Sequence, residues 1–325
     1  MTKLAYILAA SHSGSTLLSM LLGGHPQIAT VGEIKLSSRA MGDLSRYRCS
    51  CGEFIRECRF WIKVREGMAR QGYEFDIADA GTDYGAVESR YTRSLLGPMH
   101  RGRFIESVRD AALWLSPTWR RQLPEIHRRN AALVSTVSEI TKVEIVIDSS
   151  KTALRLKYLL RNLELDVKVI RLIRDGRAVA LTYTDPARFA DAKDPSKRAG
   201  GMGGDREKQR LSMTQAAYEW RRSNEEAEYI LRRLNKSQWI EIRYEELCRD
   251  TEKTLGRLFE FLGLDPKKRV KDFRSIEHHV VGNGMRLDTT SQISLDERWR
   301  EKLTDQDLKI FESTAGKMNR KYGYK

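Results

Sequence analysis

The chain has 325 residues, of which 40% are hydrophobic and 31% charged, and its formal net charge is +14. This composition supplies enough apolar residues for a core and indicates a soluble protein, and a membrane-spanning helix is excluded because no apolar run approaches about 20 residues. The excess of positive charge favours an anionic partner, such as a nucleic acid, an anionic membrane surface, or a phosphorylated or sulfated small molecule. The apolar N-terminus lacks a clean cleavage site for a signal peptide, so we expect a cytoplasmic protein.

Apolar runs and amphipathic segments alternate along the chain. The runs predict buried strands at 4–10, 143–148, 166–173 and within 238–247. Predicted helices follow at 14–23, at 149–163 after two serine caps, at 175–183 after an Asp cap, at 214–235 and at 254–264. Continuous apolar strands alternating with helices predict an α/β fold, a P-loop-like three-layer sandwich in which helices flank a central parallel sheet. We expect one domain over 1–325.

Two other regions have no regular alternation. The sequence of residues 65–130 predicts a helical insertion that shapes the side of the protein where the substrate binds. The sequence of residues 185–210 predicts a mobile loop that is either a lid or disordered. Arginines are concentrated within 101–130. They indicate either a solvated basic helix face or a surface for an anionic acceptor or a membrane.

Three of the four cysteines lie in one segment, with the spacing C-x-C-x6-C. They are Cys49, Cys51 and Cys58, and the remaining one is Cys248. A zinc site usually has two C-x2-C-like pairs or a pair of histidines to complete it, and neither is visible nearby. Free thiols, a local disulfide and a bound metal therefore stay open, and we assign no metal site.

The first predicted strand is followed by the sequence SHSGST, which is Ser11, His12, Ser13, Gly14, Ser15 and Thr16. A small polar loop between a buried strand and a helix is typical of a phosphate-binding turn, because helical N–H groups bind anions without a cationic side chain. The first Gly and the Lys of the nucleotide-triphosphatase motif are both absent. The loop therefore favours a phosphate site without a metal over a triphosphate site, although a plain capped turn would have the same sequence.

A second polar turn follows the strand at 166–173. Arg174 comes directly after that strand, and Thr182 lies eight residues further on. A guanidinium and a hydroxyl at this spacing suit a phosphate, whereas a salt bridge from Arg174 to Asp175 or to another acidic residue is the simpler alternative. Both turns follow parallel strands, so we expect them, with residues 148–151, to meet in one crevice.

These two turns resemble the motifs of sulfotransferases that use 3′-phosphoadenosine 5′-phosphosulfate (PAPS). The S-G-S-T core resembles the first motif, which binds the 5′-phosphosulfate. The sequence R-D-G-R-A-V with Thr182 resembles the second motif, which binds the 3′-phosphate and usually has Ser in place of Thr. Four further segments also resemble bacterial members, most closely the tyrosylprotein and carbohydrate branch. They are GGHPQIATVGEI, RYEELCRDTEKTLGRLFEFLGL, GNGMR with LDERWREKL, and the Cys segment.

The resemblance implies roles for particular residues. Glu33 matches the catalytic base of that branch, and Lys151 is the one match for a middle cationic site. His12 stands where the family usually has Lys or Arg, and it is a weaker cation at neutral pH. Further cofactor-binding residues implied are Asn283, Gly284 and Arg286, with Tyr244 and Trp220 as weaker candidates for the purine side. His278 and His279 receive no role.

The implied reaction is in-line transfer of a sulfuryl group from PAPS to a hydroxyl, with adenosine 3′,5′-bisphosphate as product and no metal. The acceptor is a glycan, a lipid, a small metabolite or a peptidyl tyrosine. Two alternatives remain: a P-loop nucleotide kinase, and a catalytically inactive protein of the same fold that binds a nucleotide or a nucleic acid. No nucleic-acid-binding motif is visible, so we expect no nucleic-acid partner.

Overall fold

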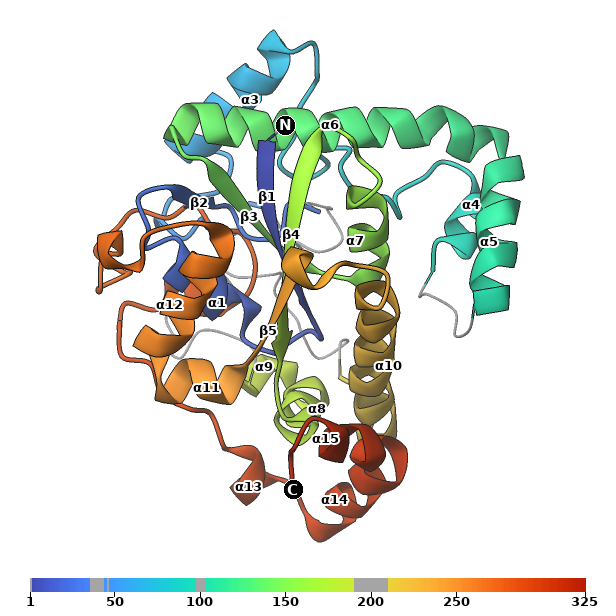
Figure 1. Ribbon diagram of the computed structural model, residues 1–325, viewed down its shortest axis with the longest axis vertical. Helices are drawn as coiled ribbons and strands as arrows, with labels where there is room; N and C mark the ends of the chain where they lie inside the picture. The colour runs from blue at the N-terminus through green and yellow to red at the C-terminus, as the bar shows by residue number, and fades with distance from the viewer. Residues whose placement is uncertain (1, 36–43, 46, 98–102, 190–209) are drawn as a thin grey trace.

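The structure, a computed structural model, describes residues 2–35, 44–45, 47–97, 103–189 and 210–325. Within these residues, five parallel strands form one sheet in the order β2-β3-β1-β4-β5 (Figure 1). The strands are β1 (Thr2–Ala9), β2 (Ile28–Thr30), β3 (Ile145–Lys151), β4 (Leu165–Ile173) and β5 (Trp239–Arg243). The predicted α/β fold with a central parallel sheet is confirmed.

Helices cover both faces of the sheet. One face carries α1 (Ser15–Leu22), α11 (Tyr244–Arg249) and α12 (Thr251–Leu262), and the other carries α3 (Arg59–Arg70), α6 (Pro117–Thr141), α7 (Ala153–Leu159) and α10 (Met213–Leu231). Alternate residues of β1 serve the two layers, since Ala5 and Ile7 pack on the α1 side and Leu4 and Tyr6 on the α6 side. This double burial explains why the strand is apolar throughout.

Shorter helices lie beyond the carboxyl ends of the strands. They are α8 (Gly176–Thr184), α9 (Pro186–Phe189), α13 (Trp299–Lys302), α14 (Asp305–Phe311) and α15 (Lys317–Lys321). Single helical turns of other types span Lys236–Gln238, Pro266–Lys268, Gly284–Leu287 and Glu312–Gly316. The α8, α14 and α15 region packs around the aromatic rings of Trp220 and Phe311.

The sequence predictions placed one strand–helix junction wrongly and missed one strand. Residues 149–151 continue strand β3 instead of starting a helix, and Thr152 is the residue before α7. The reason is Asp148, whose buried carboxylate accepts hydrogen bonds from the Ser150 N–H at 2.8 Å and from Arg155 Nε at 2.8 Å. Strand β2 was missed, because three residues are too few to show a pattern.

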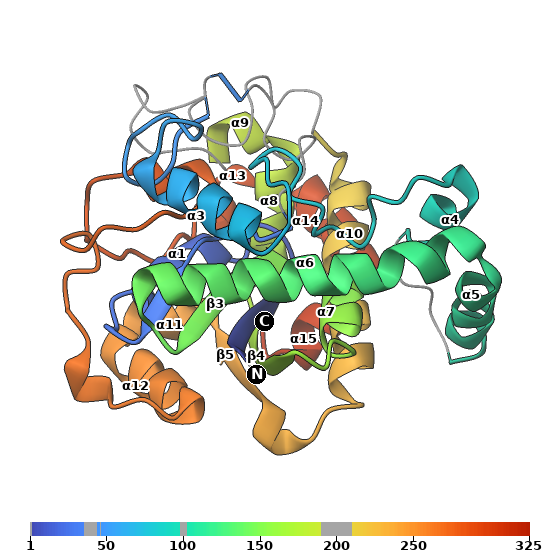
Figure 2. The same cartoon turned by 90° about the horizontal axis from the view of Figure 1, so that it is seen from above.

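Helices α3 and α6, together with α4 (Arg90–Leu95) and α5 (Arg103–Leu115), occupy the region of the predicted insertion. Figures 1 and 2 both place α4 and α5 at one end of α6, away from the sheet. Arg109 in this basic region is buried against Glu106 and so adds nothing to a surface. Most of the predicted mobile loop, 190–209, lies outside the described residues. In the described part of the chain, no helix is both long and apolar enough to span a bilayer.

Candidate functional site

A cavity of about 780 Å³ lies at the carboxyl ends of β1, β3 and β4. These are three adjacent strands with β1 in the middle. The crevice beyond such strand ends is where open parallel sheets bind ligands. The three turns that the sequence analysis expected to meet do line this one cavity, together with α8 and a C-terminal segment, 283–298.

The turn after β1 presents an uncapped helix end to the cavity. Gly14 precedes α1 with a φ of 90°, no side chain caps the helix, and its first turn holds no acidic residue. The Ser13 hydroxyl is buried without a hydrogen-bond partner in the structure. Unpaired N–H groups and an orphaned hydroxyl at a helix N-terminus fit an anionic group such as a phosphate.

Position 14 requires glycine for space as well as for its left-handed backbone. A Cβ there would lie 2.6 Å from Cδ2 of Tyr244, whose ring packs on the turn and also lines the cavity. The turn and the first residue of α11 therefore touch directly. Of the predicted loop residues, Ser11, His12, Gly14, Ser15 and Thr16 line the cavity, whereas Ser13 lies behind them.

Glu33 and Lys151 face each other across the cavity wall as an ion pair. Their side chains are 18% and 14% exposed, so the pair is largely shielded from water. Glu33 follows β2, and its N–H donates to the Val281 carbonyl at 3.2 Å. Lys151 is the last residue of β3. The structure thus brings together two residues that are 118 positions apart.

Two of the predicted catalytic residues have strained backbones. His12 has a φ of 64° and Lys151 a φ of 72°, the left-handed region that side chains other than glycine rarely adopt. Each such residue costs on the order of 1–3 kcal/mol, and this kind of strain is concentrated at functional sites. The His12 ring contacts Tyr183 edge-on, with 4.7 Å between ring centroids.

Arg174 reaches the opposite side of the cavity. It donates to the His12 carbonyl at 2.8 Å and to the Asp296 carboxylate at 2.9 Å, and its guanidinium lies 4.4 Å from the centre of the Tyr244 ring. Its Nε is buried without a partner in the structure. Thr182 lines the same cavity and donates its hydroxyl proton to the Ala178 carbonyl at 3.0 Å. The alternative of a salt bridge from Arg174 to an acidic residue is therefore also realised, with Asp296 as the partner, since Asp175 pairs with Arg177.

Asp296 is held between two arginines. Burial alone would raise the pKa of its carboxyl, but hydrogen bonds and charge from Arg298 and Arg174 hold that pKa well below its usual range. The carboxylate is therefore charged at all ordinary pH values. In this arrangement Asp296 pairs with the guanidinium of Arg174, which would otherwise face the cavity.

Two predicted binding residues lie elsewhere. Arg286 is only 1% exposed, lies outside the cavity lining, and donates to the carbonyls of Gly282 at 2.6 Å and Arg48 at 3.1 Å. Trp220 is fully buried, and its indole N–H donates to the Arg174 carbonyl at 3.2 Å, so it supports Arg174 from behind instead of stacking on a purine. Their carbonyl partners explain these positions, because buried N–H groups must be paired.

The third loop of the site is only partly as predicted. Asn283 lines the cavity, and its side chain caps the helical turn at Gly284–Leu287, whereas Gly284 is buried behind it. Sequence reasoning missed Tyr183, Asp296 and Arg298 as lining residues. Asp296 and Arg298 lie in LDERWREKL, a segment that sequence analysis singled out without assigning roles within it.

A comparison with protein-family profiles identifies one family. The profile of the "Sulfotransferase family" matches residues 5–268. No curated protein sequence matches the chain. Among solved structures, it is similar to the sulfotransferase domain from the curacin biosynthetic pathway, at 16% identity and a TM-score of 0.48, covering 100% of this chain and 99% of that one.

Two further structures have comparable coverage. One is the sulfotransferase domain of the Synechococcus PCC 7002 olefin synthase, at 16% identity and a TM-score of 0.46, covering 96% and 94% of the two chains. The other is retinol dehydratase in complex with androsterone and the inactive cofactor PAP, at 13% identity and a TM-score of 0.36, covering 93% and 85%. Because the family profile extends over most of its length, this chain belongs to the sulfotransferase family.

Proposed function

We propose that the protein transfers a sulfuryl group from PAPS to a hydroxyl acceptor. The observation that carries the proposal is the cavity itself, which brings an uncapped helix N-terminus, Arg174 and the Glu33–Lys151 pair together. The first two suit a nucleotide that bears two separate phosphate groups. The third supplies a base and a cation that line the same cavity.

The residues fit the cofactor without a metal. The turn at Ser13 to Thr16 would hold the 5′-phosphosulfate with helical N–H groups and with the hydroxyls of Ser15 and Thr16, which line the cavity. Arg174 and Thr182 would hold the 3′-phosphate. Arg174 must then exchange the Asp296 carboxylate for the phosphate, and its unpartnered Nε supports such an exchange. Tyr244, which packs on Gly14 and under Arg174, is our candidate for the purine side.

Glu33 would act as the general base. It takes the proton of the acceptor hydroxyl while that oxygen bonds to sulfur, and the bond between sulfur and the bridging phosphate oxygen breaks. The negative charge that develops on the bridging oxygen needs a cation, and Lys151 is the candidate. We expect the Lys151 ammonium to move from the Glu33 carboxylate to that oxygen, which leaves the carboxylate free to accept the proton.

His12 is the second candidate beside the phosphosulfate. The left-handed backbone holds it at the cavity wall, and its ring rests on Tyr183. We assign it a supporting hydrogen bond to the sulfuryl group, with Lys151 carrying the main charge. The acceptor class stays a glycan, a lipid, a small metabolite or a peptidyl tyrosine, with the basic residues of α6 as a further contact for an anionic acceptor or a membrane surface. A cytoplasmic location remains our expectation.

Calorimetric titration tests the cofactor. Adenosine 3′,5′-bisphosphate should bind without Mg²⁺ and more tightly than adenosine 5′-monophosphate, which lacks the 3′-phosphate. Arg174→Ala should weaken the bisphosphate by about 10- to 100-fold and leave the monophosphate nearly unchanged, since a hydrogen-bonded charge contributes about 1.5–3 kcal/mol. Arg300→Ala removes an exposed arginine and serves as the control. Equal losses for both nucleotides would refute the assignment of Arg174, and tighter binding of Mg-ATP would refute the cofactor.

A transfer assay tests the chemistry. With ³⁵S-labelled PAPS and fractionated lysate as the source of acceptors, Glu33→Gln should lower the rate of labelling by about 10²- to 10⁴-fold while the affinity for adenosine 3′,5′-bisphosphate is retained. Glu297→Gln removes a carboxylate that also lines the cavity but pairs with Arg300, and it is the matched control. Labelling by Glu33→Gln at the wild-type rate would exclude Glu33 as the base.

A further inference from the structure

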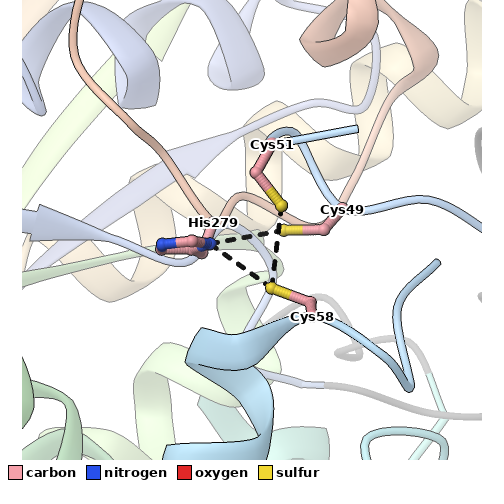
Figure 3. A group of neighbouring side chains, drawn as sticks. All are labelled: Cys49, Cys51, Cys58 and His279. Atoms are coloured by element: carbon pink, nitrogen blue, oxygen red, sulfur yellow. Dashed lines mark hydrogen bonds between the residues drawn. The ribbon is translucent and has the colours of Figure 1, made fainter. Parts of the chain in front are cut away.

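Three cysteines and a histidine from two distant segments converge outside the cavity. Cys49, Cys51 and Cys58 belong to the C-x-C-x6-C segment, and His279 lies 221 residues after Cys58. Figure 3 shows the four side chains pointing toward a common centre. One ligand atom from each, three Sγ atoms and Nδ1, can be chosen so that all lie within 4.8 Å of one another. The histidine supplies the ligand that the local sequence lacked.

The spacing of these atoms matches a tetrahedron. With metal–sulfur bonds of about 2.3 Å and a metal–nitrogen bond of about 2.1 Å, tetrahedral ligand atoms are separated by about 3.6–3.8 Å. The distance from Cys51 Sγ to Cys58 Sγ is 3.7 Å, and the distances from His279 Nδ1 to Cys49 Sγ and Cys58 Sγ are 3.7 and 3.4 Å. A central ion would therefore fit with little movement of the side chains.

The backbone around the cysteines is built to present them. The Gly52 N–H donates to the Cys49 carbonyl at 2.9 Å, and Gly52 has a φ of 95°, so the chain turns sharply around the first two sulfurs. Among the described residues beyond its two chain neighbours, no atom lies within 4 Å of the position of a Cβ on Gly52, so glycine is needed there for conformation and not for space. Cys58 directly precedes α3, and the ring of Phe60 stacks on His279 with 4.3 Å between centroids. Cys49 and Cys58 are fully buried.

We propose that Cys49, Cys51, Cys58 and His279 bind one structural Zn²⁺ ion. Three sulfurs and one imidazole nitrogen in tetrahedral arrangement are a donor set typical of zinc, and four protein ligands leave no open position for catalysis. On binding, the three thiols lose their protons to solvent, and the neutral His279 donates its Nδ1 lone pair. The ion carries two positive charges against three thiolates, so the buried site retains one negative charge.

A local disulfide is the competing structure. All four cysteines are free in the structure, and a bond between Cys51 and Cys58 would draw their sulfurs to about 2.05 Å. Such a bond would leave Cys49 and His279 facing each other with no function for their convergence. A metal uses all four groups, which is why we favour it.

The site joins two segments that shape the wall next to Glu33. Around it, the Ser50 hydroxyl accepts from the Val280 N–H at 2.8 Å, and the Tyr47 hydroxyl accepts from the Gly282 N–H at 2.8 Å. Gly282 lies beside Glu33, because a Cβ on it would be 3.5 Å from Glu33 Oε1. An ion on His279 would therefore fix, three residues away, the chain that borders the proposed base.

Metal analysis of the full chain, purified without a histidine tag, tests the proposal. Mass spectrometry of the elements should find about one zinc per chain in the wild type and in the control Cys248→Ser, whose thiol lies outside the cluster. Cys58→Ser and His279→Ala should contain far less. The proposal fails if the wild type contains no zinc and takes up none, or if the two variants retain it fully.

A second measurement does not depend on whether the variants fold. Wild-type protein stripped by a chelator is titrated with Co²⁺, which should give the intense visible absorption of tetrahedral coordination together with a thiolate-to-cobalt charge-transfer band, at one ion per chain. Zinc should then abolish both. A weak octahedral spectrum, or a Cys51–Cys58 disulfide found by peptide mapping of freshly purified protein under non-reducing conditions, would overturn the proposal.

Discussion

The two long walls of the cavity are built in different ways. The strand-end wall, made by the turn after β1 and the ends of β3 and β4, continues directly from buried strands. The C-terminal wall, residues 272–298, has no strand or long helix. One backbone bridge at Val281 and a few side-chain contacts attach it to the rest of the molecule. Arg286 donates to carbonyls, Ser50 and Tyr47 bond its backbone, and Asp296 pairs with Arg174.

The two walls are therefore held in position by different kinds of interaction. Sheet hydrogen bonds and double-sided burial fix the strand ends, so the turn at 11–16 starts from a fixed position. The C-terminal wall depends on a few buried polar contacts, each of which leaves an unpaired group when broken. We therefore expect mutations in the C-terminal wall to act mainly on stability, and mutations in the strand-end wall to act mainly on binding.

The largest effect should come from Gly32, where the two walls meet. It has a φ of 81°, and an added Cβ would lie 1.8 Å from the Val281 carbonyl oxygen. Gly32→Ala should lower the free energy of unfolding by on the order of 4 kcal/mol, because backbone atoms cannot yield. Gly14→Ala, with a clash only against the Tyr244 ring, should cost on the order of 1–2 kcal/mol but abolish nucleotide binding.

Urea denaturation followed by circular dichroism measures both free energies, and calorimetry measures nucleotide binding. The comparison of the walls would be broken if Gly32→Ala were as stable as the wild type, or if Gly14→Ala kept its affinity for adenosine 3′,5′-bisphosphate.

Arg286 separates a structural role from a cofactor-binding one. Arg286→Met should lower the free energy of unfolding by on the order of 3 kcal/mol, because the carbonyls of Arg48 and Gly282 lose their donor. In the fraction that remains folded, the affinity for adenosine 3′,5′-bisphosphate should change by less than about threefold, which is under 0.7 kcal/mol. Thermal unfolding with and without nucleotide measures both quantities. A stable variant that no longer binds nucleotide would restore Arg286 to the cofactor site.

Asp296 should restrain nucleotide binding. Asp296→Asn frees Arg174 and Arg298, so the affinity for adenosine 3′,5′-bisphosphate should rise by about tenfold, or 1.4 kcal/mol. Because the two arginines keep the pKa of Asp296 far below its usual range, the wild-type carboxylate stays charged and the gain should be constant from pH 8 to pH 5. Glu297→Gln, which removes the neighbouring charge, should show no such gain. A loss of affinity in Asp296→Asn would mean that Asp296 positions Arg174.

The smallest effect should come from His12. If Lys151 carries the charge on the bridging oxygen, His12→Lys should change kcat/KM by less than about threefold and keep the shape of the pH–rate profile. Lysine is less well suited than histidine to a φ of 64°, so a small loss of stability should accompany it. The transfer assay between pH 5.5 and 8.5 measures this. A profile that becomes flat at high pH only in His12→Lys would show that the histidine is the working cation.

The sequence by itself determined the frame of the protein. Continuous apolar runs that alternate with helices predict the strands of a parallel sheet, and polar turns after such strands meet at one edge of that sheet. Those two facts located the turn at 11–16, Lys151 and Arg174 correctly, and Asp175 capped its helix as predicted. The family also followed from these local motifs.

Only the tertiary structure decided which polar residues face the cavity and which support it. Arg286 and Arg174 look alike in sequence, but the first donates to the carbonyls of Arg48 and Gly282, whereas the second reaches the cavity and Asp296. The cysteine segment contains three of the four proposed zinc ligands, and the fourth, His279, lies more than 200 residues away. Contacts between distant segments depend on how the chain packs, and periodicity and local spacing carry no record of that packing.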